Sequence, residues 1–424
     1  MEKPLTNNIR PGEEPLDLKG YEKAGGYQAA RKALKSMTTQ EIIEIVKNSN
    51  LRGRGGAGFL TGVKWSLMPK IDDTTRPRYL ITNTDEMEPG TFKDRLLLEG
   101  DPHQLIEGII ISSFAVQADV AYIFIRMEYS LSAERLKRAI SEAYNNNYLG
   151  KNIFGSGYNL ELHIHESAGR YICGEETALL NALEGKRAIP RAKPPYATTA
   201  GLWGKSTVIN NAETICNIPH IINNGADWFK SISRSKDGGT KLYGVSGKVR
   251  KPGLWELPMG TTIREIIEEH AGGMQDGFKL RGIIPGGAST DILVEEHLDM
   301  KMDFDSLQKA GSRMGTGTMI ILDDQTCPVG MVLNLERFFA RESCGWCTPC
   351  REGLPWLVKI LEDIEEGRGC PEDLDVLQSH VWLMRPGNTF CALAPGAMEP
   401  LGSVLKYFRA DFELHINEKR CPWS

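Results

Sequence analysis

The stretch "RYLITNTDEMEPG", residues 78–90, joins an apolar run to an acidic turn that closes with Pro-Gly. Apolar residues rich in β-branched and aromatic types, followed by turn formers, are typical of a buried strand and the loop after it. Similar strand-like runs recur further along the chain and alternate with helical ones. Strands are predicted at 78–82, 121–126 and 161–166, and helices at 103–117, at 132–148 and from near Gly174. This alternation predicts an α/β fold with a mostly parallel, helix-covered sheet.

Two further regions follow this one. Between 238 and 324, "KLYGVSGKV" and "GLWELP" flank the turn "RKPG", a single helix is predicted at 262–271, and "LRGIIPGG" and "GTMIILDD" supply further strands. This pattern predicts a small α+β module with one helix packed on a mixed sheet. After Pro328, four apolar segments have helical spacing and predict a four-helix bundle. We therefore expect three domains, at residues 1–237, 238–325 and 326–424.

Composition excludes several classes of function. The chain has 424 residues, is 41% hydrophobic and carries a formal charge of -5, so it gives no general reason to expect nucleic acid or an anionic membrane as a partner. The most apolar stretch, at 105–125, contains Glu107, Gln117 and Asp119 and does not resemble a membrane span. The N-terminus lacks the apolar core of a signal peptide. We expect a cytoplasmic protein in which clustered cysteines bind metal or take part in redox chemistry.

Three cysteines stand three residues apart in "CGWCTPC", at Cys344, Cys347 and Cys350. This spacing favours an iron-sulfur cubane, in which each thiolate takes one iron corner, over zinc or over simple burial of three small apolar groups. A fourth cysteine must come from elsewhere. Proline follows Cys327, Cys370 and Cys421, as in ferredoxins, whereas Cys391 lies in the turn-rich loop "PGNTFCALAPG" between two predicted helices. The residues alone favour Cys391 slightly.

A glycine-dense loop, "LRGRGGAGFLTGVKW" at 51–65, contains Gly53, Gly55 and Gly58 in a G-x-G-x-x-G pattern. A helical segment precedes it where the ordinary dinucleotide fold has a strand, so that fold is not predicted. With Arg54 and Lys64, the loop can still present backbone N–H groups and positive charge to phosphates. The alternative is a flexible loop.

Three other stretches place polar groups beside predicted strands and helices. In "NTDEMEPG", Asn83, Asp85, Glu86 and Glu88 follow a strand, where ligands of α/β sheets bind, and would suit the hydroxyl and ring N–H groups of a flavin or ribose; a solvated acidic turn is the alternative. In "YICGEETALL", Glu175 and Glu176 open a helix, where they could simply complement its dipole. In "VINNAETICN", an asparagine pair and Thr214 at the start of a helix form a possible phosphate site.

Taken together, "GRGGAGF" with "KW", "DEMEPGTFKDR", "GRYICGEETALLNALEG", "INNAETICNIP", "ESCGWCTPCREG" and "TFCALAPGA" resemble the NADH-binding flavoprotein subunit of bacterial respiratory complex I, the NADH:quinone oxidoreductase. The resemblance extends from about residue 26 to 415. It implies a flavin-binding α/β domain, a β-grasp domain and a helical bundle that carries one [4Fe-4S] cluster. Two positions depart from the family's usual pattern: Leu60 stands where proline is usual, and Thr84 where alanine is usual.

The resemblance also assigns residues. The cluster ligands would be Cys344, Cys347, Cys350 and Cys391. FMN and NADH would contact Arg54, Gly55, Gly56, Ala57, Gly58, Phe59, Gly62, Lys64, Asn83, Asp85, Glu86, Glu88, Tyr171, Gly174, Glu175, Glu176, Tyr196, Ile209, Asn210, Asn211, Thr214, Ala392 and Leu393. Within this set, the phosphate of FMN would lie near the asparagine pair, and Phe59 and Tyr196 would stack on adenine.

In such a protein NADH gives up two electrons as hydride, whereas an iron-sulfur cluster accepts one, so FMN must stand between them. No general base is needed, and no catalytic residue is assigned. The resemblance implies as partners a small [2Fe-2S] thioredoxin-like subunit and a larger subunit with several clusters, with the complex at the inner face of the cell membrane and no direct membrane insertion by this chain. The same subunit type also serves soluble NAD-linked hydrogenases and formate dehydrogenases. An iron-sulfur scaffold that has lost its flavin is the non-enzymatic alternative.

Overall fold

The computed structural model describes residues 2–71 and 76–423, which form two compact units. The first unit comprises residues 1–87, 92–242 and 256–260, and the second comprises residues 88–91, 243–255 and 261–424. The predicted boundaries of three domains stay predictions.

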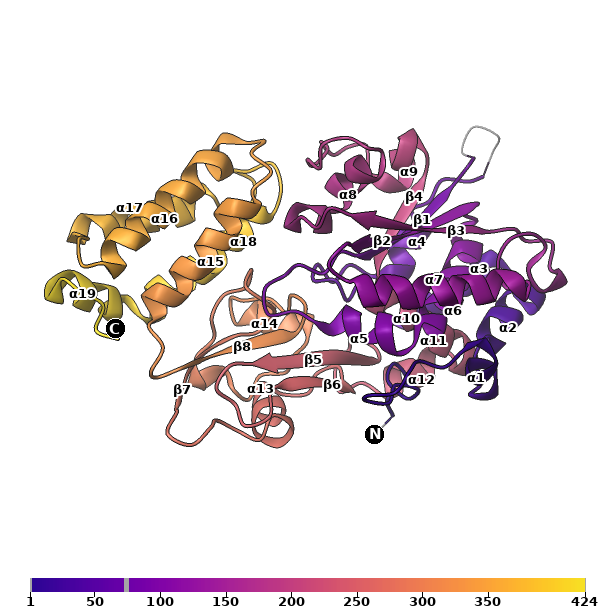
Figure 1. Cartoon of the computed structure of the whole chain (residues 1–424), viewed down its shortest axis with the longest axis horizontal. Helices are drawn as coiled ribbons and strands as arrows, with labels where there is room; N and C mark the ends of the chain where they lie inside the picture. The colour runs from indigo at the N-terminus through magenta and orange to yellow at the C-terminus, as the bar shows by residue number, and fades with distance from the viewer. Residues whose placement is uncertain (1, 72–75, 424) are drawn as a thin grey trace. The chain divides into compact units, whose positions relative to one another are not determined.

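The first unit is built on a parallel sheet in the order β3-β2-β1-β4 (Figure 1). Its strands are β1 (Tyr79–Thr84), β2 (Val120–Arg126), β3 (Glu161–Ser167) and β4 (Thr207–Asn211). The helices that join them are α5 (Lys93–Gly100), α6 (Pro102–Val116), α7 (Ser130–Asn145), α8 (Glu176–Leu183) and α9 (Ala197–Ala200). The predicted strands and helices of this region are therefore confirmed, with ends that differ by a few residues.

The sheet is covered on both faces because its chain order reverses beside β1. The connections from β1 to β2 and from β2 to β3 contain α5, α6 and α7. The connection from β3 back to β4, on the other side of β1, contains α8 and α9. Right-handed crossovers then place these two groups of helices on opposite faces (Figure 1). The carboxyl ends of β1 and β4 are neighbours on either side of this reversal, which is where open α/β sheets bind ligands.

Short helices surround this sheet. They are α1 (Leu18–Lys23), α2 (Gln28–Ser36), α3 (Thr39–Asn48), α4 (Thr61–Ser66), α10 (Ala212–Cys216), α11 (Ile218–Asn224) and α12 (Ala226–Ser231). Apolar side chains of α2, α3, α6 and α11 are buried together in one core with those of the strands. The helix α3, as predicted, precedes the glycine-dense loop and has a capping box formed by Thr38 and Glu41.

A second, mixed sheet has the order β6-β5-β8-β7. Its strands are β5 (Thr240–Ser246), β6 (Gly253–Pro258), β7 (Leu280–Ile284) and β8 (Thr318–Asp323). β5 pairs with β8 in parallel, and β7 pairs with β8 antiparallel. The single predicted helix of this region is present as α13 (Ile263–Glu265) followed by a π-helical turn, η4 (Ile266–His270), and α14 (Phe304–Lys309) comes later in the chain. The small α+β module is confirmed.

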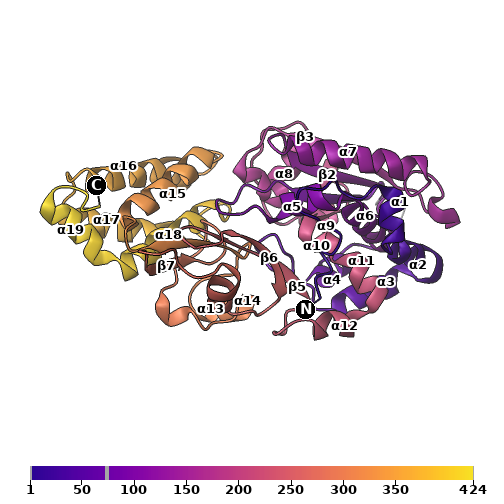
Figure 2. The same ribbon diagram turned by 60° about the horizontal axis from the view of Figure 1, so that its bottom comes forward.

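The remainder of the second unit is a helical bundle (Figure 2). Its helices are α15 (Pro328–Glu342), α16 (Leu354–Glu365), α17 (Pro371–Leu383), α18 (Leu393–Tyr407) and α19 (Arg409–Glu418). The last predicted segment is divided in two at Phe408, whose backbone leaves the helical region with φ -127° and ψ 27°. In residues 2–71 and 76–423, no helix combines the length and the apolar character needed to cross a membrane.

Candidate functional site

Three of the sequence motifs meet at the carboxyl ends of β1 and β4. Asn83 on β1 lies opposite Asn211 on β4 in the register of the sheet. The Asn83 amide donates to the Gly174 carbonyl over 3.2 Å, which brings in the turn of 3₁₀ helix η2 (Tyr171–Gly174) that precedes α8. A Cβ added at Gly174 would meet nothing within 4 Å, so the backbone here borders open space. The parallel sheet thus collects polar groups around a site that a planar ligand can approach.

The glycine-dense loop closes onto the same edge. Its ends are joined by a bond of 2.9 Å from the Gly53 N–H to the Phe59 carbonyl. The Arg54 backbone N–H donates to the Thr214 hydroxyl over 2.8 Å, and a Cβ added at Gly55 would stand 3.0 Å from that of Asn211. The loop is therefore packed directly on the junction of β4 and α10, where a larger residue at Gly55 would crowd Asn211.

Glycine is also required by the backbone of this loop. Gly56 and Gly58 have φ values of +127° and +67°, in the region that disfavours other residues. A Cβ added at Gly62 would stand 2.4 Å from the Lys47 backbone nitrogen, so the start of α4 lies tightly against α3. The loop and α4 are in this way packed closely against their neighbours.

The two departures from the usual family pattern fit their positions. Leu60, which precedes α4, has φ -64°, the value that a proline ring would impose. The backbone path is therefore kept without proline. Thr84 is buried, and its hydroxyl donates to the Phe124 carbonyl of β2 over 2.6 Å.

Lys64 carries positive charge to the site. Its ammonium donates to the Ile209 carbonyl over 2.9 Å and to a Glu176 carboxylate oxygen over 3.0 Å. The other oxygen of Glu176 accepts from Lys193 over 3.0 Å. Burial opposes ionisation of Glu176, but the charges of Lys64 and Lys193 outweigh it and lower the pKa of this carboxyl to about 2. Glu176 is thus ionised at neutral pH, between two cations.

Glu175 begins α8 as its N-cap. One oxygen accepts from the backbone N–H groups of Thr177 and Ala178, each over 2.8 Å, while the other accepts from Lys193 over 3.2 Å. The helix-dipole interpretation of this motif therefore holds for Glu175. The same residue also borders Gly174, so capping and ligand contact do not exclude each other.

The Arg54 side chain lies differently from our expectation of a charge displayed by the loop. Its guanidinium is buried and donates to the carbonyls of Gly238 and Thr240 over 2.7 and 3.1 Å. Of the two cationic side chains in this motif, Lys64 therefore reaches the site, whereas Arg54 contributes through its backbone.

Glu86 supports the site by capping α5. Its carboxylate accepts from the backbone N–H groups of Lys93, Asp94 and Arg95 over 3.0, 2.9 and 3.3 Å. Burial and the nearby Asp94 raise the pKa of Glu86 to about 7. The neighbouring Asp85 is also buried, and its backbone N–H donates to the Asn83 side chain over 3.0 Å. Direct contact of Glu86 with a cofactor stays a prediction.

Two aromatic residues expected beside the adenine are exposed. Phe59 on the loop and Tyr196 before α9 have 53% and 60% of their surface accessible. Large apolar side chains this exposed are available for stacking on a ligand. Asn210, in contrast, is turned inward and accepts from the Trp65 indole over 3.0 Å.

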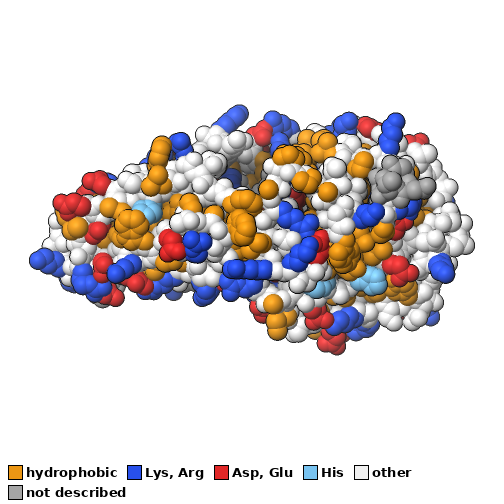
Figure 3. All heavy atoms as spheres, turned by 90° about the horizontal axis from the view of Figure 1, so that it is seen from above, with side chains coloured by type: hydrophobic (Ala, Val, Ile, Leu, Met, Phe, Trp, Pro, Cys, Tyr) orange, Lys and Arg blue, Asp and Glu red, His pale blue; other side chains and the backbone are white. Residues whose placement is uncertain are grey.

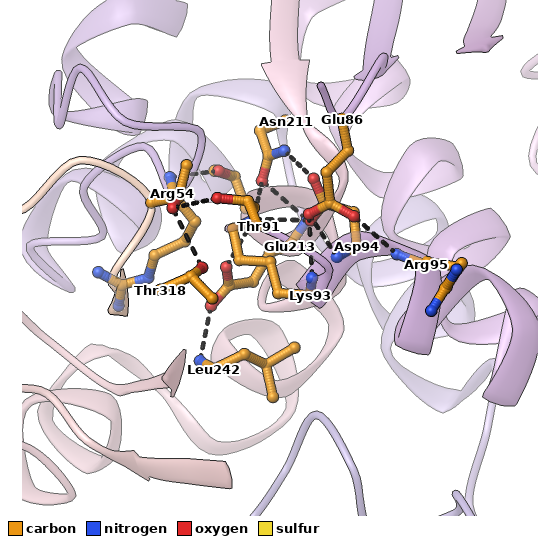
Figure 4. Close-up of polar contacts among 12 residues, drawn as sticks. Arg54, Glu86, Thr91, Lys93, Asp94, Arg95, Asn211, Glu213, Leu242 and Thr318 are labelled. Atoms are coloured by element: carbon orange, nitrogen blue, oxygen red, sulfur yellow. Dashed lines mark hydrogen bonds and ion pairs between the residues drawn. The ribbon is translucent and has the colours of Figure 1, made fainter. Parts of the chain in front are cut away.

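A buried network of charges beneath Asn211 was missed by the sequence analysis (Figure 4). The Lys93 ammonium contacts Asp94 over 2.7 Å and Glu213 over 2.9 Å, and donates to the Asn211 amide oxygen over 3.4 Å. Glu213 also accepts from Lys241 over 3.0 Å, and Asn211 donates to Asp94 over 2.6 Å. These contacts fix the orientation of Asn211. The only sequence signal was the motif "TFKDR", which carried no role of its own.

Three predicted contact residues belong to the second unit. Glu88 accepts from the Ser289 backbone N–H over 2.6 Å. Ala392 is the N-cap of α18, and Leu393 is its buried first residue. Their expected contacts with a nucleotide stay predictions.

Four cysteines of the second unit come together. Cys344 and Cys347 lie in the loop after α15, Cys350 lies in the π-helical turn η6 (Pro349–Gly353), and Cys391 lies between α17 and α18. Burial, together with the charges of Cys347, Cys391 and Cys344, raises the pKa of Cys350 to about 12. Each of these three cysteines therefore lies close enough to Cys350 to act on it electrostatically. A neutral thiol is disfavoured once iron binds it, so such a set suits a cationic iron cluster that draws the protons off.

The other three candidates for the fourth position lie elsewhere. Cys370 is exposed at the start of α17. Cys327 and Cys421 lie beside Glu365 and His415 in a separate group. Of the four alternatives that the sequence left open, only Cys391 stands with the triplet among the described residues.

Comparison with known proteins gives a consistent result. Three family profiles match: the Nuo51 FMN-binding domain at residues 46–220, the SLBB domain at 241–318, and the NADH-ubiquinone oxidoreductase-F iron-sulfur binding region at 330–415. The F subunits of NADH-quinone oxidoreductase from Salmonella typhimurium and from Escherichia coli are each 57% identical to this chain over 98% of it and 93% of their own length. An NAD+-reducing [NiFe]-hydrogenase structure is similar with a TM-score of 0.83 and 33% identity, over 95% of this chain and 67% of that one.

Proposed function

The chain belongs to the family of the NADH-quinone oxidoreductase F subunit, and from this membership we propose that it oxidises NADH with FMN and passes the electrons through a [4Fe-4S] cluster toward quinone. The observation that supports this proposal is that three polar motifs and a glycine loop meet where the strand order of a parallel sheet reverses. The other unit of the same chain brings four cysteines near one another. When bound, FMN takes up hydride from NADH and releases electrons singly, and the cluster carries them onward.

The residues at the sheet edge fit FMN. Gly174 leaves open space for a ring system, and Asn83 and Asn211 supply amide groups on neighbouring strands. The Lys64 ammonium, held by a backbone carbonyl and by Glu176, supplies a cation for a polar edge of the flavin. The N–H groups where β4 meets α10 would receive the phosphate, beside the Thr214 hydroxyl.

The residues of the chain would position the cofactor and the substrate and set the charges around them. Lys93, Asp94 and Glu213 hold Asn211 in a fixed orientation before any ligand arrives, so no reorganisation is needed on binding. The glycine loop presents backbone N–H groups beside the same edge for the phosphates of NADH, and the exposed rings of Phe59 and Tyr196 would enclose its adenine. The chain's part in the reaction would be to position the flavin and the nicotinamide for hydride transfer, with no proton transfer by a side chain.

In the second unit, Cys344, Cys347, Cys350 and Cys391 would hold the cluster. Aromatic side chains stand beside it. Trp346, between two of the cysteines, and Phe390, next to Cys391, are 54% and 42% exposed, with ring centroids 6.2 Å apart. Exposed aromatic groups of this kind are typical of surfaces that partners cover. Hydrophobic side chains lying among Lys and Arg are visible on the face seen in Figure 3.

The relatives are subunits of a larger complex, which supports partners for this chain. We propose that these are a small [2Fe-2S] thioredoxin-like subunit and a larger subunit with several iron-sulfur clusters. The assembly would lie peripherally at the inner face of the cell membrane, with this chain on the cytoplasmic side. A diaphorase subunit of an NAD-linked hydrogenase is the second candidate, supported by the similar hydrogenase structure. The lower identity to that structure, 33% against 57%, favours the quinone-linked function.

Lys64→Ala tests the flavin site. Loss of a charge-assisted bond to a buried ligand costs about 1.5–3 kcal/mol, so FMN should dissociate about 10- to 100-fold more readily, and NADH-dependent dye reduction should fall with flavin content. Flavin fluorescence on dilution, together with dye and quinone reduction by the complex, measures both. Lys35→Ala, an exposed lysine of α2, is the control. Full flavin retention in Lys64→Ala would reject the site, and a wild-type complex without NADH oxidation would reject the function.

Glu176→Gln should relax the preference for NADH over NADPH. The family resemblance implies that Glu176 lies beside the adenosine ribose of NADH, where an ionised carboxylate would repel a 2'-phosphate at short range. Its removal would leave Lys64 and Lys193 to attract one. We expect the ratio of kcat/KM for the two nucleotides to fall by about tenfold or more. Glu44→Gln on α3, far in sequence from the motif, should keep the wild-type ratio. Unchanged discrimination in Glu176→Gln would show that this carboxylate does not face the ribose.

A further inference from the structure

Two cysteines that the proposed redox centre does not use lie with a histidine and a glutamate at one end of the bundle. One ligand atom from each of Cys327, Glu365, His415 and Cys421 lies within 4.8 Å of all the others. The Cys327 sulfur is 3.3 Å from His415 Nε2 and 3.4 Å from a Glu365 carboxylate oxygen, and these last two atoms are 3.2 Å apart. In a tetrahedral zinc site, bond lengths of about 2.0–2.3 Å place neighbouring ligand atoms about 3.4–3.8 Å from one another.

The four side chains come from four separate segments. Cys327 immediately precedes α15, Glu365 is the last residue of α16, His415 lies on α19, and Cys421 lies in the tail after it. The C-terminus lies beside these helices in both ribbon views (Figures 1 and 2). His415 is 0% and Cys421 8% exposed. Thiol, imidazole and carboxylate groups from separate parts of the bundle are therefore gathered in one protected place.

The surroundings orient the histidine as a ligand. His415 Nδ1 is 2.6 Å from the Asp411 carbonyl, which can only accept, so Nδ1 carries a proton and Nε2, which faces Cys327 and Glu365, is the nitrogen left to bind a metal. The Asp411 carboxylate in turn accepts from Arg281 over 2.6 Å. The Trp423 ring stacks on the imidazole with centroids 5.7 Å apart and planes 16° apart. Metal-binding histidines are typically fixed in this way by a hydrogen bond on the other nitrogen.

We propose that Cys327, Glu365, His415 and Cys421 bind a zinc ion. Two thiolates, one imidazole and one carboxylate form a mixed set that favours tetrahedral Zn²⁺ over the hard, oxygen-preferring cations. Four protein ligands fill the coordination sphere, so the site is structural. The ion fastens the C-terminal tail to the beginning of α15 and the end of α16. This proposal is independent of the flavin and of the iron cluster.

Metal analysis of the purified complex tests the site, because zinc is counted separately from iron. We expect about one zinc per chain in the wild type, and loss of that zinc in Cys421→Ser and in His415→Gln. Cys370→Ala, at an exposed cysteine outside the group, should keep it. Zinc that persists in Cys421→Ser would belong to another place and overturn the proposal.

A measurement on the wild type covers the case in which the variants fail to fold. X-ray absorption at the zinc edge should report two sulfur and two nitrogen or oxygen ligands, at about 2.3 and 2.0 Å. A spectrum with sulfur ligands alone would mean zinc in place of iron at the other four cysteines, and would refute the site. So would a wild-type complex free of zinc, or mass spectrometry that finds a disulfide between Cys327 and Cys421.

Discussion

Cys391→Ala should abolish the EPR signal of the reduced [4Fe-4S] cluster or convert it to that of a three-iron cluster. A cubane held by three thiolates has one iron without a protein ligand, and that iron is easily lost. Cys370 is exposed at the start of α17, and Cys327 and Cys421 lie in a separate group with Glu365 and His415, so none of these three thiols stands ready to replace it. Low-temperature EPR of the dithionite-reduced complex measures the effect.

The same variant should keep flavin reduction by NADH and lose electron transfer beyond the flavin. FMN would be held by residues of the other unit, so NADH should still reduce a dye that takes electrons directly from flavin. Electron transfer to the partner's clusters and to quinone should be lost. Cys370→Ala is the matched control, because that cysteine is followed by proline and was an alternative ligand by sequence. A normal cluster in Cys391→Ala together with cluster loss in Cys370→Ala would overturn the ligand set.

Lys93→Met should strongly destabilise the first unit. The Lys93 ammonium is 1% exposed and lies between Asp94 and Glu213. Although burial alone would lower it, the charges of Asp94, Glu213 and Glu86 raise the pKa of Lys93, so the ammonium stays charged at neutral pH. Removing one partner of a buried ion pair costs about 3–5 kcal/mol, because the remaining charges stay buried without compensation. That is a large part of a typical net stability of about 5–15 kcal/mol.

Differential scanning calorimetry of the complex should show the transition of this unit lowered by about 10 °C or more. FMN should also be retained less well, since Asn211 loses one of the contacts that orient it. Lys47→Met removes an exposed lysine whose ion pair with Glu44 lies on the surface of α3, and should change little. Equal transition temperatures for the two variants would show that the buried network does not hold the unit together.

Much of the fold could be predicted because its signals are local. The alternation of strands and helices around residues 78–90, the change of pattern near 238 and the helical spacing after Pro328 each depend on a few consecutive residues. The division of the last helical segment at Phe408 could not be predicted, because apolar residues keep helical spacing across it and neither glycine nor proline marks it.

Part of the candidate site could also be predicted from local sequence motifs. Motifs that follow strands were expected at one edge of a parallel sheet, and the register of Asn83 opposite Asn211 agrees with that expectation. The burial of charged side chains could not be predicted from the sequence. Lys93 and Arg54 look like ordinary surface cations in the sequence, yet both are 1% exposed or less. Their partners come from segments about 120 to 190 residues away, at Glu213, Gly238 and Thr240.

The sequence by itself determined the parallel sheet, the mixed-sheet module, the helical bundle and the clustered thiols of Cys344, Cys347 and Cys350, because periodicity and spacing lie within short segments. The residues favoured Cys391 as the fourth cysteine only slightly, whereas tertiary structure brings it near the triplet and places Cys327 and Cys421 beside His415 and Glu365. Proline after a cysteine is a feature of the neighbouring residue, whereas the position of a sulfur atom depends on how α15, α17, α18 and α19 pack together. Distances between remote residues are set by that packing, because buried apolar faces fix the helices against one another.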